Sequence, residues 1–87
     1  MAIKDKVVII TGASSGIGAA TAELLAKRGA KLVLAARREE KLKAVAENIQ
    51  SVGAEVIYQV TDVTKKTDNQ KLVDQAIEVY GKVDVIF

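Results

Sequence analysis

The sequence predicts an α/β fold with a parallel sheet, in the element order β-α-β-α-β-α-β. Short apolar runs alternate along the 87 residues with longer segments in which apolar residues recur at helical spacing. Most positions within the runs are apolar, as in strands that are buried on both faces. Because the connections are short, each helix is expected to be a right-handed crossover between parallel strands. We therefore expect part of a doubly wound fold, a sheet with strand order 3-2-1-4 and flanking helices.

The first strand and the first helix are predicted over residues 6–11 and about 15–28. The strand is a continuous apolar run that ends at Gly12. Gly29 follows the helix at the position where a left-handed residue commonly ends a helix. The residues expected on one face of this helix are Ile17, Ala20 and Leu24.

The second strand and the second helix are predicted over residues 31–36 and about 39–52. The helix carries apolar residues at i, i+3, i+4 and i+7, which is the spacing of one buried face. Glu39 and Lys43 lie four residues apart on the other face and are expected to pair. Gly53 is expected to end the helix. The apolar residues of this helix are Leu42, Val45, Ala46 and Ile49.

The remaining residues predict a strand over 55–60, a helix, and a fourth strand over 83–87. Thr67-Asp68-Asn69-Gln70 has the S/T-x-x-E/Q form of a capping box, which predicts the start of the helix there. Gly81 is expected to end it. The face that should pack on the sheet is formed by Leu72, Val73, Ala76, Ile77 and Tyr80.

Composition excludes several classes of function. The net charge is only +2 and the basic residues are scattered, which argues against nucleic acid as a partner. Because the chain has no His and no Cys, it offers no thiolate nucleophile, no histidine base and no expected metal site. The apolar run Val7–Ile10 is too short for a secretory signal, and no stretch approaches the roughly 20 apolar residues of a membrane span. A soluble cytoplasmic protein without a membrane partner is the expectation.

A glycine-rich loop, Thr11-Gly12-Ala13-Ser14-Ser15-Gly16-Ile17-Gly18, joins the first strand to the first helix. Gly12 permits a tight turn, Gly16 has no side chain to keep a phosphate from the backbone, and Gly18 lets the helix pack closely. The unpaired N–H groups of the first helical turn favour an anion. No Lys follows the glycines as in NTP-binding loops, so a dinucleotide diphosphate is the expected ligand. The candidate residues are Gly12, Ser14, Ser15, Gly16, Ile17 and Gly18.

Three motifs in order resemble the N-terminal half of a short-chain dehydrogenase/reductase. They are TGASSGIG at 11–18, Asp62-Val63 after the third strand, and Gly81-x-Val83-Asp84-Val85 before the fourth. The resemblance covers the whole chain and implies a Rossmann-type fold and the interconversion of a small-molecule carbonyl and alcohol by hydride transfer. It also implies that Asp62 accepts from the adenine amino group and that the Val63 N–H bonds the ring. By position alone, Asp62 is as well explained as a turn or cap residue.

Position 36 indicates which cofactor is preferred. In NAD-binding sheets an acidic residue at the end of the second strand holds the ribose 2′-hydroxyl, but here Ala36 is followed by Arg37 and Arg38. An arginine bonds a 2′-phosphate with about 1.5–3 kcal/mol, which predicts a roughly 10- to 100-fold preference for NADP(H) over NAD(H). The resemblance implies the same, with Arg37 and Ser14 near that phosphate. Arg38 is also a candidate, although it is explained more simply as a solvated charged residue at the start of the second helix.

The catalytic residues that the resemblance implies are not found in this chain. Related enzymes use Tyr-x-x-x-Lys with a Ser and an Asn, whereas Asp62 follows Tyr58 and Asp84 follows Tyr80 at that spacing. We therefore expect residues 1–87 to be the NADP-binding half of a Rossmann domain, inactive alone. The alternatives are a non-catalytic dinucleotide-binding module and a truncated or engineered half-domain that self-assembles. The apolar edge Val83–Phe87 predicts pairing with another copy, and thus a homo-oligomer.

Overall fold

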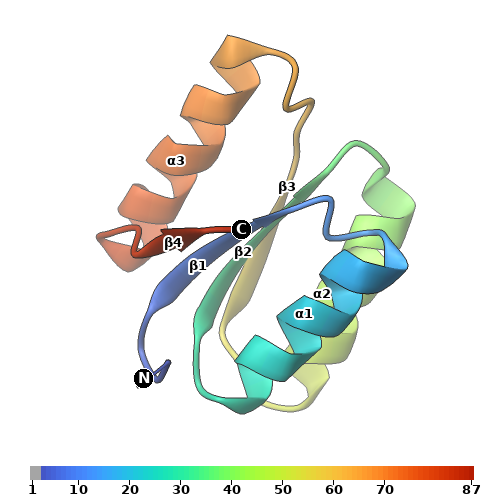
Figure 1. The fold of residues 1–87 in the computed structure, drawn as a ribbon, viewed down its shortest axis with the longest axis vertical. Coiled ribbons are helices and arrows are strands. Elements are labelled where there is room, and N and C mark those ends of the chain that lie inside the picture. Colours follow the sequence, from blue (N-terminus) through green and yellow to red (C-terminus); the bar gives the residue numbers. More distant parts are fainter. Residues whose placement is uncertain (1–2) are drawn as a thin grey trace.

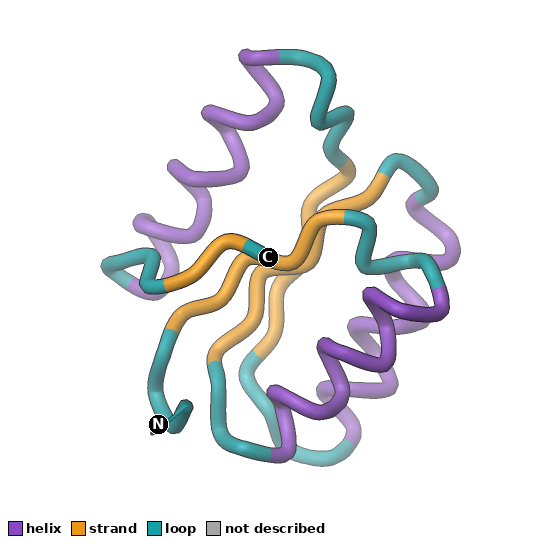
Figure 2. The backbone as a smooth tube through the Cα atoms, in the orientation of Figure 1, coloured by secondary structure: helices purple, strands orange, loops and turns teal. Residues whose placement is uncertain are grey.

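A computed structural model describes residues 3–87 and places a four-stranded parallel sheet between helices (Figure 1). The strand order is β3-β2-β1-β4, as predicted. Helices α1 and α2 cover one face of the sheet and α3 covers the other (Figure 2). The elements are β1 (Val7–Thr11), α1 (Gly16–Lys27), β2 (Lys31–Ala36), α2 (Glu39–Ser51), β3 (Val56–Val60), α3 (Lys66–Tyr80) and β4 (Val85–Ile86).

The core is divided by the sheet, because successive side chains of β1 and β2 point to opposite faces. Val8 and Ile10 of β1 pack with Leu32 and Leu34 of β2 against α1 and α2. The alternate residues of both strands pack against Leu72 and Ala76 of α3. These two central strands are therefore buried on both faces, which explains their nearly continuous apolar sequence. The residues of the second set are Val7, Ile9, Val33 and Ala35.

The apolar residues expected on one face of α1 do not form the buried side of that helix. Ile17 is 80% exposed and Leu24 is 53% exposed, and Ala20 is exposed as well. The residues that face the sheet are small ones, and small side chains let the helix approach the strands closely. Because apolar residues occur all round this helix, their spacing alone does not identify the buried side. The buried residues of α1 are Gly18, Ala22 and Ala26.

The predicted capping box at the start of α3 is also wrong. The helix begins at Lys66, its N-cap residue is Lys65, and no side chain caps its end. Thr67 lies inside the first turn, and the side chains of Asp68 and Asn69 bond the preceding loop instead. These side chains therefore hold the loop before the helix and do not form a capping box.

The predicted helix-ending glycines are confirmed, whereas one predicted ion pair on the surface of α2 is not. Gly29 and Gly53 follow the C-cap residues of α1 and α2, Gly81 is the C-cap residue of α3, and all three have a positive φ, as expected of helix-ending glycines. The ion pairs among the described residues are Lys31–Glu55 and Lys82–Asp84, and the predicted Glu39–Lys43 pair is not one of them. Ile77 of the predicted α3 face is half exposed.

Asp84 fixes the fourth strand to the first. Its carboxylate Oδ2 accepts from the backbone N–H of Val7 at 2.8 Å, and its own N–H donates to the Val7 carbonyl oxygen at 2.9 Å. The Val7 bond, and then the bond from Lys82 at 3.1 Å, hold the pKa of Asp84 below its usual range. β4 is shorter than the predicted strand over 83–87, although Phe87 still forms backbone hydrogen bonds with Ile9 and Thr11 of β1. Val85, Ile86 and Phe87 are all exposed.

Two kinds of feature are not found within residues 3–87. No helix in this range combines the length and the hydropathy needed to cross a bilayer. Nor do three or more acidic side chains in this range gather as metal ligands would.

Candidate nucleotide-binding site

The glycine-rich loop and the ends of β2 and β3 meet at one edge of the sheet. This is the edge formed by the carboxyl ends of parallel strands, where open α/β sheets bind their ligands. A cavity of about 240 Å³ opens there. Five of the predicted site residues contribute to its wall. The lining residues are Gly12, Ser14, Ala36, Arg37, Arg38, Thr61 and Val63.

Some backbone N–H groups of the glycine-rich loop donate to carbonyl oxygens of the protein, and others have no acceptor among the described residues. Ala13 donates to the carbonyl oxygen of Ala35 at 3.1 Å, and Ser15 donates to that of Gly12 at 3.1 Å. Unpaired N–H groups at the beginning of a helix are suited to phosphate oxygens, which accept several hydrogen bonds at once. The loop N–H groups that have no partner among residues 3–87 are those of Gly12, Ser14, Gly16 and Ile17.

The three glycines of the loop meet different structural requirements. Gly12 has φ +67°, which favours glycine, and it makes the turn out of β1. A Cβ at Gly16 would meet no atom of this chain within 4 Å, so the space in front of its backbone is open. A Cβ at Gly18 would collide with the carbonyl oxygen of Gly12. Gly18 therefore allows α1 to lie directly against the backbone of the loop. The sequence had suggested that this glycine brings the helix close to the sheet instead.

Ser15 holds the loop and the helix together. Its backbone is extended, and it is the N-cap residue of α1. Its Oγ accepts from the N–H of Gly18 at 3.2 Å and donates to the carbonyl oxygen of Gly12 at 2.8 Å. The side chain of Ser15 is thus used in shaping the loop.

Two arginines follow β2 at the mouth of the cavity. Arg37 and Arg38 are exposed, and neither forms an ion pair within 4 Å among the described residues. Their positive charge is therefore available to an anion in the cavity. Ala36, the last residue of β2, is buried and supplies no carboxylate to the same wall.

Asp62 was open to two interpretations, as a turn residue or as a ligand of adenine, and the structure shows the hydrogen bonds of a turn residue. Its Oδ1 accepts from the backbone N–H of Thr64 at 3.0 Å and from the Thr64 hydroxyl at 2.6 Å. These bonds are the main reason that the pKa of Asp62 lies below its usual range, and the positive charge of Arg37 adds a smaller effect. The second oxygen, Oδ2, has no partner among residues 3–87. A turn role and a ligand role are thus compatible.

Thr61 is a cavity residue that the sequence interpretation missed. It is 1% exposed, and its hydroxyl donates to the Gln59 carbonyl oxygen at 3.0 Å. Its position directly after β3, beside Asp62, was the available signal. Of the predicted residues that do not line the cavity, Ser15, Gly16, Ile17 and Gly18 lie in the adjoining helix start, and Asp62 lies between two lining residues.

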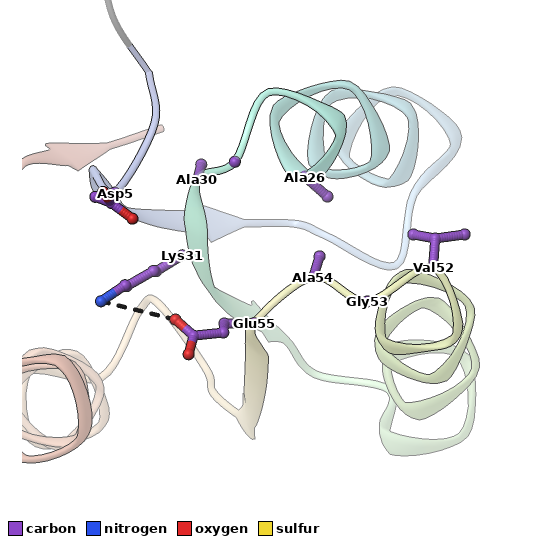
Figure 3. A pocket seen from close by; sticks show the side chains of 9 residues that line it. Asp5, Ala26, Ala30, Lys31, Val52, Gly53, Ala54 and Glu55 are labelled. Carbon is purple, nitrogen blue, oxygen red and sulfur yellow. Dashed lines mark ion pairs between the residues drawn. The ribbon is translucent and has the colours of Figure 1, made fainter.

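A larger cavity, of about 450 Å³, lies at the opposite edge of the sheet. Figure 3 shows its residues, with the side chains of Lys31 and Glu55 directed toward one another at 3.7 Å. It lies between the ends of α1 and α2 and the beginnings of β2 and β3. The carboxyl ends of the strands and the helix N-terminus are both at the other edge, so the smaller cavity is the better candidate.

The family of this chain follows from comparison with known proteins. The family described as short chain dehydrogenase matches residues 6–87, and the chain belongs to this family. An uncharacterized oxidoreductase from Listeria innocua is 66% identical over 87 residues, covering all of this chain and 35% of the relative. The 11-beta-hydroxysteroid dehydrogenase B of Sesamum indicum is 47% identical over 83 residues, covering 94% of this chain and 23% of the relative. The chain thus spans about a third or less of the length of these relatives.

Solved structures show the same fold with a nicotinamide dinucleotide. A short chain dehydrogenase/reductase from Burkholderia phymatum in complex with NAD has a TM-score of 0.97 and 44% identity, covering 100% of this chain and 31% of that one. A metagenomic short-chain oxidoreductase in complex with NADP has a TM-score of 0.89 and 35% identity, covering 99% and 39%. The fold is therefore one that binds nicotinamide dinucleotides, with NAD in one relative and NADP in the other.

Proposed function

We propose that residues 1–87 form the NADP(H)-binding half of a Rossmann domain in an oxidoreductase. The whole protein would interconvert a small-molecule carbonyl and alcohol, with the nicotinamide supplying or accepting the hydride. The observation that carries the cofactor assignment is the cavity wall at the end of β2, where Ala36 is followed by two arginines that have no ion-pair partner among residues 3–87. The residues proposed to hold the cofactor are Gly12, Ser14, Ser15, Gly16, Ile17, Gly18, Arg37, Arg38, Asp62 and Val63.

Each part of the wall suits one part of the dinucleotide. The free N–H groups of the glycine-rich loop suit the diphosphate. Arg37, assisted by Ser14, suits the 2′-phosphate, because a guanidinium makes charge-assisted bonds to phosphate oxygens. Asp62 and the N–H of Val63 suit the adenine ring. Arg38 lies on the same wall and adds positive charge at its mouth.

Parallel titration with NADPH and NADH tests the cofactor preference. We expect NADPH to bind roughly 10- to 100-fold more tightly, since one arginine–phosphate interaction contributes about 1.5–3 kcal/mol. Arg37→Gln should remove most of this preference by weakening NADPH alone. Arg28→Gln removes an equal charge beyond the other end of α1 and is the matched control. Equal affinities of the unaltered protein for the two nucleotides would contradict the proposal.

Catalysis is proposed to require residues other than these. Neither Tyr58 in β3 nor Tyr80 in α3 is followed by Lys at the spacing of the family pair. A polypeptide of residues 1–87 should therefore bind NADPH without reducing any carbonyl compound. Turnover by that polypeptide would contradict the assignment, and failure of the full-length protein to turn over would favour a non-catalytic binding module.

We further propose that the edge strand β4 pairs with another copy of the chain when nothing else covers it. Ile86 is 63% exposed and lies on an apolar strand with one unpaired edge. Such an edge is a template for strand pairing. Sedimentation of residues 1–87 should show a dimer that Ile86→Lys disrupts and that Ile17→Lys, a change at an exposed residue of α1, leaves intact. A monomer at high concentration would contradict this assembly.

A further inference from the structure

The loop that follows β3 is held by the first turn of α3. The backbone N–H of Asp62 donates to Asp68 Oδ2 at 3.0 Å, and the side-chain amide of Asn69 donates to the carbonyl oxygen of Val63 at 2.8 Å. The peptide group between Asp62 and Val63 is held as well, since its carbonyl oxygen accepts from the N–H of Lys65 at 2.9 Å. Asp68 and Asn69 are both half-buried. Three successive peptide groups are therefore fixed in one arrangement.

After these bonds, a neighbouring donor and acceptor on Val63 and Asp62 have no partner among residues 3–87. They are the N–H of Val63 and the Oδ2 of Asp62, since Oδ1 already accepts twice from Thr64. Adenine presents an amino donor beside a ring-nitrogen acceptor, which complements an acceptor and a donor on neighbouring residues. Hypoxanthine presents a carbonyl acceptor beside an N–H donor, which is the reverse pattern. The bonding of the loop thus leaves a pair suited to adenine.

We propose that Asp68, together with Asn69, is a positioning residue that makes the site selective for adenine. This rests on the proposed function, because the groups that Asp68 positions are those proposed to meet the adenine ring. Asp68 contacts the loop backbone and not the nucleotide. Its effect is to fix the direction of the Val63 N–H relative to the carboxylate of Asp62.

The location of Asp68 explains why a carboxylate suits this task. It lies in the first turn of α3, where the helix dipole favours a negative charge. An ionised acceptor makes a stronger bond to a backbone N–H than a neutral one does. Asn at this position would keep an acceptor oxygen of the same reach, whereas Ala would leave the N–H of Asp62 without its partner.

The test compares NADPH with its hypoxanthine analogue, in which a carbonyl replaces the amino group of the base. Affinities are measured by titration of the full-length protein. We expect the unaltered protein to prefer NADPH by roughly 10-fold or more, the equivalent of one hydrogen bond that involves a charge. In Asp68→Ala the preference should fall below about 3-fold, while Asp68→Asn should retain it. Asp74→Ala is the matched control, since Asp74 lies on the same helix and its side chain accepts a hydrogen bond from Gln70 of that helix, not from the loop after β3.

The outcomes separate positioning from a purely structural role. An Asp68→Ala protein that binds both nucleotides more weakly but keeps the preference would overturn the proposal. If Asp68→Ala does not fold, Asn69→Ala provides the same comparison, and an unchanged preference there would overturn it equally. An unaltered protein that binds both nucleotides equally would also overturn it, while leaving the proposed function intact. Binding of neither nucleotide would instead overturn the proposed function itself.

Discussion

Gly18→Ala should destabilise the fold by about 1–3 kcal/mol, the cost of inserting a methyl group into a closely packed site. The added Cβ would collide with the carbonyl oxygen of Gly12 and lie 3.0 Å from the Cα of Ala13. Both neighbours are backbone atoms, so neither can move aside as a flexible side chain would. The strain should separate α1 from the loop and break the bond between Ser15 and Gly18. Thermal unfolding measures the loss, and the same variant should bind nucleotide poorly.

Gly16→Ala is the matched control, because it adds the same methyl group two residues away. A Cβ at Gly16 would meet no atom of this chain within 4 Å. Its unfolding temperature should therefore remain close to that of the unaltered protein. Its affinity for NADPH should nevertheless fall, since the methyl group would occupy the space proposed for the diphosphate. Equal stability losses in both variants would show that the loop is not packed as described.

Ala36→Asp should reverse the cofactor preference. The new carboxylate would stand at the end of β2, on the cavity wall beside Arg37. It would accept from the ribose hydroxyls of NADH, repel a 2′-phosphate and compete for the arginine. If each of these three effects changes the ratio of NADPH to NADH affinity by roughly 10-fold, the ratio should fall by roughly 1000-fold, which reverses a preference of roughly 10- to 100-fold. Titration with both nucleotides measures the ratio.

Ala36→Asn has nearly the same shape as Ala36→Asp without the charge. It should weaken NADPH much less, because it neither repels the phosphate nor neutralises Arg37. If the two variants bind NADPH equally, the 2′-phosphate does not lie beside position 36. The proposed location of that phosphate would then be wrong.

The arrangement of the elements could be predicted because each is specified locally. Continuous apolar runs predicted the central strands β1 and β2, and helix-ending glycines predicted the ends of all three helices. The short connections then left the strand order 3-2-1-4 as the expected solution. In a parallel sheet the residues that follow β1, β2 and β3 lie at the same edge. The cavity formed by Gly12, Arg37 and Val63 lies there.

The features that were missed depend on contacts that the local spacing of residues does not specify. Nothing local in α1 shows that its small residues, rather than Ile17 and Leu24, face the sheet. The pattern beginning at Thr67 resembles a capping box, but Asp68 bonds a loop six residues earlier instead. Thr61 enters the cavity wall only because β3 ends beside β2. In each case the deciding contact involves residues outside the sequence pattern on which the prediction rested.

The most direct test of the proposed site follows the backbone amides of the glycine-rich loop by NMR while NADPH is added. We expect the largest shifts at the N–H groups without a partner in the described chain, while Ala13 and Ser15, which already donate within the protein, should change less. Those four groups belong to Gly12, Ser14, Gly16 and Ile17. NADH should move the same four amides but leave the side chain of Arg37 unchanged. Shifts confined to residues 53–55, at the opposite cavity, or no shifts in the loop, would contradict the diphosphate site.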